Sequence, residues 1–259
     1  MRLRHDLIAS LSYVFVSGKV VLPMETTLLR KHTLVEEVSD RLAGAIRAGR
    51  LALDGLLPSE RDLAGRFGVS RPVVREATKR LELQGLVEVR QGIGIRVIDR
   101  LHTPVSAAAR MLLPEEGERL RQSLEVRSVL EPEIARRAAE RAGKADLAVL
   151  RRIHASLGAA ADLAAAMESD LAFHRELARI SGNELFGLVL DTIADLGRES
   201  RRATMSEAGV GRAVKQHAAV LRAIELGDGN AAARAMGKHI DSAVGDLLAH
   251  QDKGRKGRK

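Results

Sequence analysis

An acid and an imidazole lie one helical turn apart in the stretch ESDLAFHREL. Asp170 and His174 have the i, i+4 spacing of a single helix face, and they share that face with Met167 and Leu177. Burying such polar groups without partners would cost about 1–3 kcal/mol each, so partners are expected. A carboxylate and an imidazole are also two of the side chains that bind divalent metal ions in proteins.

Two further histidines have the same inward placement. His217 falls on a stripe with Val214 and Leu221, and His239 follows Met236 at helical spacing. An isolated inward histidine is more often a hydrogen-bonded core residue than a ligand, but here four polar groups come from three predicted helices. A shared ion would remove their joint burial penalty. Three imidazoles and one carboxylate suit Zn, Ni or Mn and leave coordination positions open.

The helices that would position these groups fill residues 117–251. Segments such as DLAVLRRIHASLG and NELFGLVLDTIADLG are rich in Ala and Leu, repeat every 3.6 residues and meet at Gly or Asn. About six such helices and no strand pattern predict an all-α bundle. Residues 101–116, LHTPVSAAARMLLPEE, are predicted to be a linker, and residues 252–259, DKGRKGRK, a basic disordered tail.

Residues 32–100 predict a winged helix-turn-helix, so the fold class is mainly α with a small β-hairpin wing. An amphipathic helix, TLVEEVSDRLAGAIRAGRL, precedes two short helices with N-caps at Ser59 and Ser70. Beyond Gly85, LVEVR and IRVID alternate like strands around the turn QGIG.

The third of these helices carries a basic stripe. Arg71, Arg75 and Lys79 are spaced i, i+4, i+8, and Arg61 stands in the first turn of the preceding helix. A solvated surface is the ordinary explanation of such a stripe. Next to a wing whose turn contains Gly92, the stripe instead predicts contact with double-stranded DNA in the major groove.

Composition narrows the classes of function. The chain has no Cys, so disulfides and Cys-bound metal centres are excluded, and aromatic residues are only 2%, which disfavours stacking on bases. The formal charge is +8, of which the last eight residues carry +4. We predict that residues 1–31 are a disordered extension, with Met24 as an alternative start, and we expect no export signal and no membrane segment.

The run LPSERDLAGRFGVSRPVVREATKRLELQGLVEVRQGIGIRV, residues 57–97, resembles the N-terminal domain of GntR-family bacterial transcription regulators. The resemblance implies that Arg61, Arg71 and Arg75 contact operator DNA. It also places further residues close to the DNA backbone or minor groove, namely Ser70, Gln91 and Gly92.

The C-terminal half resembles the FCD ligand-binding domain of the FadR subfamily, through EVRSVLEPEIA, DLAFHRELARISGN and the two late histidines. The resemblance implies a metal-binding set, Asp170, His174, His217 and His239. It also implies a small carboxylate effector, an organic or sugar acid, beside the metal. Arg127 interrupts an apolar stripe and is a candidate to bind that carboxylate, although a structural ion pair with Glu131 explains it equally well.

These patterns together predict a ligand-responsive repressor that is not an enzyme. Two chains would form a homodimer and bind an operator with two-fold symmetry in the cytoplasm, associated with the nucleoid. Two alternatives remain. One is a DNA-binding regulator that senses the metal itself, and the other is an enzyme that uses the metal to activate water.

Overall fold

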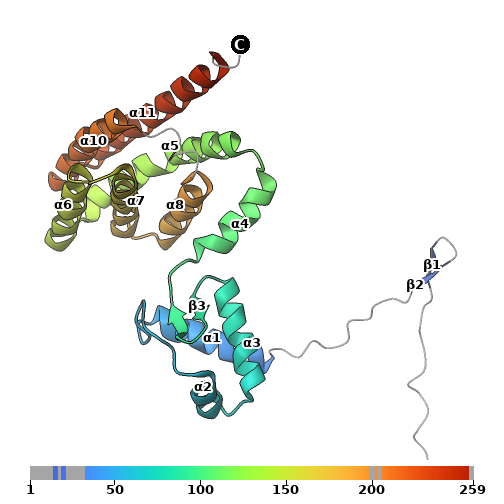
Figure 1. The fold of residues 1–259 in the computed structure, drawn as a ribbon. Helices are drawn as coiled ribbons and strands as arrows, with labels where there is room; N and C mark the ends of the chain where they lie inside the picture. The colour runs from blue at the N-terminus through green and yellow to red at the C-terminus, as the bar shows by residue number, and fades with distance from the viewer. Residues whose placement is uncertain (1–13, 17–18, 22–32, 199–201, 203–205, 257–259) are drawn as a thin grey trace, which may run out of the picture.

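The computed structural model describes residues 14–16, 19–21, 33–198, 202 and 206–256 (Figure 1). A hairpin of β1 (Val14–Val16) and β2 (Lys19–Val21) comes first. The winged helix contains α1 (Leu34–Arg47), α2 (Glu60–Phe67), α3 (Arg71–Leu83), β3 (Val87–Arg90) and β4 (Gly94–Val97). The helical part contains α4 (His102–Leu112), α5 (Glu116–Arg141), α6 (Lys144–Gly158), α7 (Leu163–Ile180), α8 (Glu184–Leu196), α10 (Glu207–Glu225) and α11 (Gly229–Lys256).

The predicted winged helix-turn-helix is confirmed, with its own core between α1, α2, α3 and the hairpin. Leu42, Leu63 and Leu81 are buried there together with residues of both wing strands. Ser59 caps α2 by accepting from the backbone N–H of Asp62. Ser70 stands at the N-cap position of α3, but its exposed hydroxyl makes no capping hydrogen bond.

The wing is a two-stranded antiparallel hairpin in which Val87 pairs with Val97 and Arg90 with Gly94. Gly92 in its turn has a φ of 77°, which favours glycine because a Cβ is strained in this region. The segment before α2 extends the hairpin, since the Leu57 amide donates to the Ile95 carbonyl at 2.8 Å.

The six helices predicted for the C-terminal half correspond to α5, α6, α7, α8, α10 and α11, and they form a bundle (Figure 1). α11 packs along α5 and α10, while α7 contacts α5, α6 and α8. The main core is apolar and includes Ile134, Phe173, Leu177 and Met236, all at most 1% exposed. Asn183 caps α8 by accepting a hydrogen bond from the backbone N–H of Leu185.

Three segments differ from the sequence prediction. The predicted linker contains helix α4, which packs on α8 instead of running as an irregular connection. Helix α11 continues to Lys256, into the segment predicted as a disordered tail. Within the predicted N-terminal extension, β1 and β2 form an antiparallel hairpin, while Met24 lies outside the described residues. Among the described residues, no helix is long and apolar enough to cross a membrane.

Candidate metal centre, effector cavity and DNA-binding face

The four metal-ligand candidates meet inside the bundle. Asp170 and His174 come from α7, His217 from α10 and His239 from α11. Each offers one ligand atom, and these four atoms lie within 4.8 Å of one another. All four side chains are buried.

The spacing of the atoms fits a single ion. The Nε2 atoms of His217 and His239 are 3.3 Å apart, and Asp170 Oδ1 lies 3.4 Å from His217 Nε2. His174 Nε2 lies 3.8 Å from the same oxygen. Ligand atoms that bind one ion at about 2.0–2.2 Å are roughly 3–4 Å apart from each other, so the donor set needs little movement to close on an ion.

The electrostatics of the histidines also suit a cation. Burial lowers the pKa of His217 well below its usual value, and lowers the pKa of His239 to about 3. Both imidazoles are therefore neutral at pH 7 and can offer a lone pair. Burial also lowers the pKa of His174, but the carboxylates of Glu131 and Asp170 outweigh burial and raise it. These two carboxylates can therefore stabilise either a proton on His174 or a metal ion bound to it.

Two residues that the sequence prediction did not assign to the metal site hold the outward nitrogens of these rings. Glu131, 1% exposed, contacts His174 Nδ1 through Oε2. Gln216 Oε1 lies 3.1 Å from Nδ1 of His239. Such contacts fix the ring orientation and tautomer of a ligand histidine. His217 is placed differently, because Phe173 stacks on its ring with centroids 4.2 Å apart.

Arg127 forms the ion pair with Glu131 that its sequence position allowed, and its contact with a carboxylate effector stays a prediction. It is only 8% exposed, and its Nε donates to Oε1 of Glu131. Its Nη2 lies 3.4 Å from Nε2 of His174, so the guanidinium also reaches the edge of the metal-ligand cluster. Burial raises the pKa of Glu131, but Arg127 and His174 outweigh it and lower that pKa, which keeps the carboxylate ionised.

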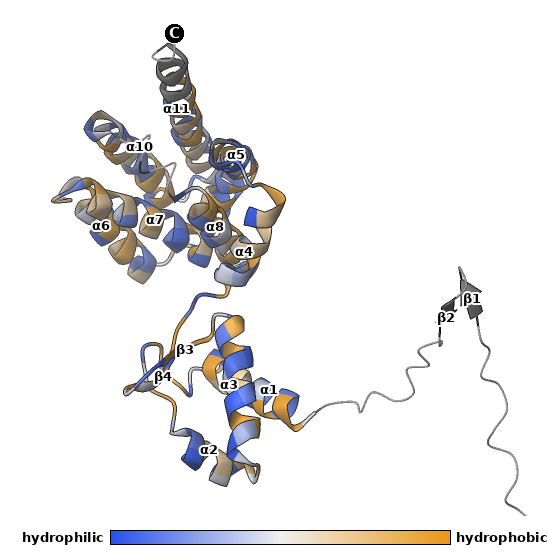
Figure 2. Cartoon of the chain, turned by 45° about the vertical axis from the view of Figure 1, so that its right-hand side comes forward, coloured by the Kyte–Doolittle hydropathy of each residue, from blue (hydrophilic) through white to orange (hydrophobic). Residues whose placement is uncertain are grey.

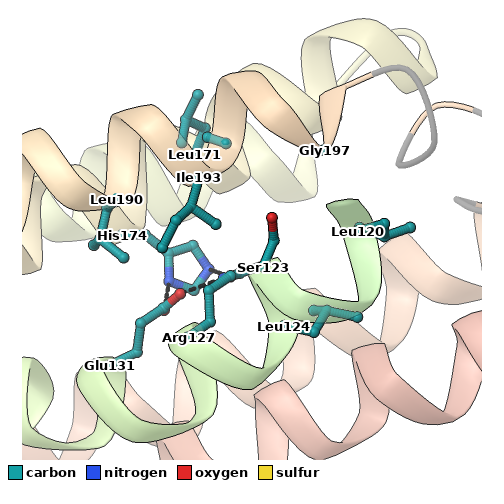
Figure 3. Close-up of a pocket in the computed structure, with 11 residues that line it drawn as sticks. Leu120, Ser123, Leu124, Arg127, Glu131, Leu171, His174, Leu190, Ile193 and Gly197 are labelled. Carbon is teal, nitrogen blue, oxygen red and sulfur yellow. Dashed lines mark hydrogen bonds and ion pairs between the residues drawn. The ribbon is translucent and has the colours of Figure 1, made fainter. Parts of the chain in front are cut away.

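A small cavity of about 30 Å³ opens beside this group (Figure 3). Its polar end is formed by Arg127, Glu131 and His174, while Ser123 contributes a hydroxyl. The remaining wall is apolar and comes from α5, α7 and α8, with Leu120, Leu124, Leu171, Leu190, Ile193, Ala194 and Gly197. The space suffices for water, and an organic molecule would need side chains to move.

The predicted DNA-contacting residues lie on one domain and are exposed. Hydrophilic residues recur along α3 (Figure 2), and the exposed set comprises Arg61, Ser70, Arg71, Arg75, Lys79, Gln91 and Gly92. Arg75 forms an ion pair with Glu60, and Lys79 with Glu76. Among the described residues, the side chain of Arg71 has no hydrogen bond or ion pair.

Comparison with protein families matches both domains. Residues 34–97 match the family of bacterial regulatory proteins named gntR, and residues 122–242 match the FCD domain. The HTH-type transcriptional regulator LutR of Bacillus subtilis is 34% identical over 79% of this chain and 96% of its own length. The HTH-type transcriptional repressor NanR of Cronobacter sakazakii is 32% identical over 88% of this chain and 91% of its own.

A solved structure has the same fold. Streptococcus agalactiae GntR aligns with a TM-score of 0.65 and 26% identity, covering 81% of this chain and 98% of its own. These families and relatives are transcription regulators and not enzymes. The chain is therefore a member of the GntR family of DNA-binding transcription regulators, with an FCD ligand-binding domain and the domain arrangement of the FadR subfamily.

Proposed function

We propose that this protein is a transcription repressor whose operator binding responds to a small carboxylate held beside a divalent metal ion. Asp170, His174, His217 and His239 would bind the metal, which would be Zn, Ni or Mn. When bound, the ion would offer open coordination positions to an oxygen of the effector. The name of the NanR relative, a repressor, supports the direction of control.

One observation carries this proposal: a cavity whose polar end joins a buried arginine to the metal-ligand cluster. Arg127 lines the cavity and reaches to 3.4 Å from His174 Nε2. Among side chains, arginine is best suited to bind a carboxylate through two parallel hydrogen bonds, because its guanidinium is planar and always charged. The apolar wall would accommodate the carbon skeleton of a small organic or sugar acid.

The cavity is also linked to the segment that leads to the DNA-binding domain. α8 contributes Leu190, Ile193 and Ala194 to its wall, and Asp195 of the same helix binds α4. An effector that moves α8 would therefore change how α4 is held. Coupling requires the effector to bind the two arrangements with different affinity.

We further propose a homodimer that presents two copies of α3 to an operator with two-fold symmetry. In this proposal residues 32–100 bind DNA, and residues 117–251 bind the effector and form the dimer. Helix α4 belongs with the second of these domains, because it packs on α8. Arg61, Arg71, Arg75 and Lys79 would contact the major groove, and Gln91 and Gly92 the minor groove.

A thermal-shift screen of organic and sugar acids tests this function, run on metal-loaded and on metal-stripped protein. A ligand present at about 100 times its dissociation constant adds ~2.7 kcal/mol to the free energy of unfolding. We expect at least one acid to stabilise the loaded protein and to lose its effect after stripping. The Arg127→Lys variant should bind that acid more weakly while still binding metal, and unchanged acid affinity would contradict the assigned role of Arg127.

The size of the cavity favours a second candidate, a regulator that senses the metal alone. A space of 30 Å³ holds water without any movement of side chains, but no organic acid. In that case no acid would shift the melting temperature of either form. DNA affinity would instead follow the concentration of free metal ion.

A further inference from the structure

Arg75 is held between the two helices of the helix-turn-helix. Its Nε lies 3.3 Å from Oε1 of Glu60, and its Nη2 lies 3.1 Å from Oε2. One edge of the guanidinium thus meets both oxygens of one carboxylate. By contrast, Lys79 pairs with Glu76, three residues earlier on α3 itself, so that pair gives no link to another helix.

The fold fixes the position of the Glu60 carboxylate. Glu60 is the first residue of α2, directly after the capping residue Ser59. The start of α2 cannot shift easily against α3, because α2 buries Leu63 and Ala64 in the core shared with Val74 of α3. The side chain of Glu60 is 28% exposed, compared with 53% for Arg75.

The contact leaves the outer end of the guanidinium free. An arginine has five N–H donors in a planar fork. Glu60 engages the Nε and Nη2 edge, so Nη1 and the second hydrogen of Nη2 remain for another acceptor. Those two donors form the pair that binds O6 and N7 of a guanine in the major groove.

We propose that Glu60 is a positioning residue that orients Arg75 toward one base pair of the operator, and so determines specificity there. This inference rests on the proposed DNA-binding face. An arginine without such a partner is as able to contact a phosphate as a base, whereas a fixed fork favours the base. An exposed ion pair adds little to folding stability, so the role of Glu60 would show in specificity rather than in stability.

The experiment is a selection of binding sites from duplexes with a randomised central region, using the full chain. Wild type, Glu60→Gln, Arg75→Ala and the matched control Glu76→Gln are compared. We expect Arg75→Ala to lose the base preference at one position in each half-site. Glu60→Gln should weaken the preference at that same position by about fivefold or more, the discrimination that one bidentate contact supplies.

Affinity for a single random-sequence duplex separates positioning from general binding. Glu60→Gln should keep or increase that affinity, because it removes a negative charge from the DNA-binding face. Glu76→Gln should keep the selected sequence. If Arg75→Ala leaves the selected sequence intact, the proposed DNA-binding face is wrong. If Arg75→Ala changes it but Glu60→Gln does not, the face stands and the positioning role of Glu60 is wrong.

Discussion

The nitrogens that face away from the metal-ligand cluster explain why its rings converge. His174 presents Nε2 inward because Glu131 holds its Nδ1, and His239 does the same because Gln216 holds its Nδ1. A ring that is free to rotate would present either nitrogen, and an ion would have to order it on binding. The two outer contacts thus prepare the site before an ion arrives.

We predict that Gln216→Ala weakens metal binding by about 10-fold or more, the lower part of the range for outer contacts of metal sites. A 2.7 Å hydrogen bond to the hydroxyl of Ser242 holds the amide of Gln216 in place. Because the variant loses the contact between this amide and His239 Nδ1, the His239 ring is free to rotate. Isothermal titration of stripped protein with zinc measures the dissociation constant. Lys215→Ala, one residue earlier on the exposed side of α10, should bind zinc as wild type does. Equal affinities for the two variants would refute the role of Gln216.

The sequence predicted the four ligand candidates but not their outer contacts. Helical spacing shows which residues share a face, so Asp170 and His174 could be paired from the sequence. Of the two ionic partners of Glu131 it shows only Arg127, four residues earlier, since His174 is 43 positions away and on another helix. Gln216 stands next to His217 in sequence and still binds His239 across the packed pair α10 and α11.

At the scale of elements, a single carboxylate connects the cavity wall to α4. Asp195 accepts a hydrogen bond of 2.7 Å from Ser106 and one of 3.1 Å from Arg110. Burial raises the pKa of Asp195, but the bonds from Ser106 and Arg110 outweigh it and lower that pKa. Asp195 is therefore ionised at neutral pH, and its contribution to the docking of α4 is lost only as the pH falls through its lowered pKa.

Asp195→Ala should loosen α4 while leaving the bundle folded. It leaves the fully buried hydroxyl of Ser106 without this acceptor, although that hydroxyl also bonds to the backbone within α4. We expect the amides of residues 102–112 to exchange with deuterium at least several-fold faster, measured by mass spectrometry. Asp191→Ala is the matched control, because Asp191 lies one turn earlier on α8 and pairs with Arg175. Unchanged exchange in α4 of the Asp195 variant would show that the carboxylate is not needed to hold this helix, and that its packing and the Arg110 bond to the backbone carbonyl of residue 195 suffice.

Helix α4 also shows why a sequence pattern can miss an element. Its one buried residue is Ser106, and apolar residues such as Val105 and Met111 are exposed. The periodic apolar face that identifies the other helices is therefore absent, and Pro104 in the first turn looks like a break although this position tolerates it. The buried Ser106 contacts a carboxylate 89 positions away, a partner that no local sequence pattern shows.

At the scale of the whole molecule, the two cores are separate, so metal removal should act on one of them. The metal-ligand cluster lies in the bundle core, and the winged helix has its own core. An ion at about 100 times its dissociation constant adds ~2.7 kcal/mol, which corresponds to roughly 5–10 °C in the melting temperature of a domain of this size.

We therefore predict that chelation lowers the bundle transition by roughly 5–10 °C in calorimetry and leaves the transition of the winged helix in place. Asp170→Asn, which weakens one ligand, should reduce this difference. His154→Gln is the control, because His154 lies 2.9 Å from the Val214 carbonyl oxygen and outside the cluster. If both transitions fell together, metal binding would be coupled to the DNA-binding domain in the absence of DNA.

The salt dependence of DNA binding reports how many chains bind one duplex. Each phosphate contact that a cation makes contributes about 0.9 to the slope of log affinity against log salt concentration. Lys79 is exposed on α3, and its 3.0 Å ion pair with the exposed Glu76 adds little free energy, so Lys79 is available to a phosphate. In a homodimer on a two-fold symmetric site, Lys79→Ala removes two such contacts, and the slope should fall by about 1.8. A monomer would lose half as much. Lys215→Ala, on the bundle, should leave the slope unchanged. A fall of only about 0.9 for Lys79→Ala would contradict the dimer and indicate that a single chain binds each duplex.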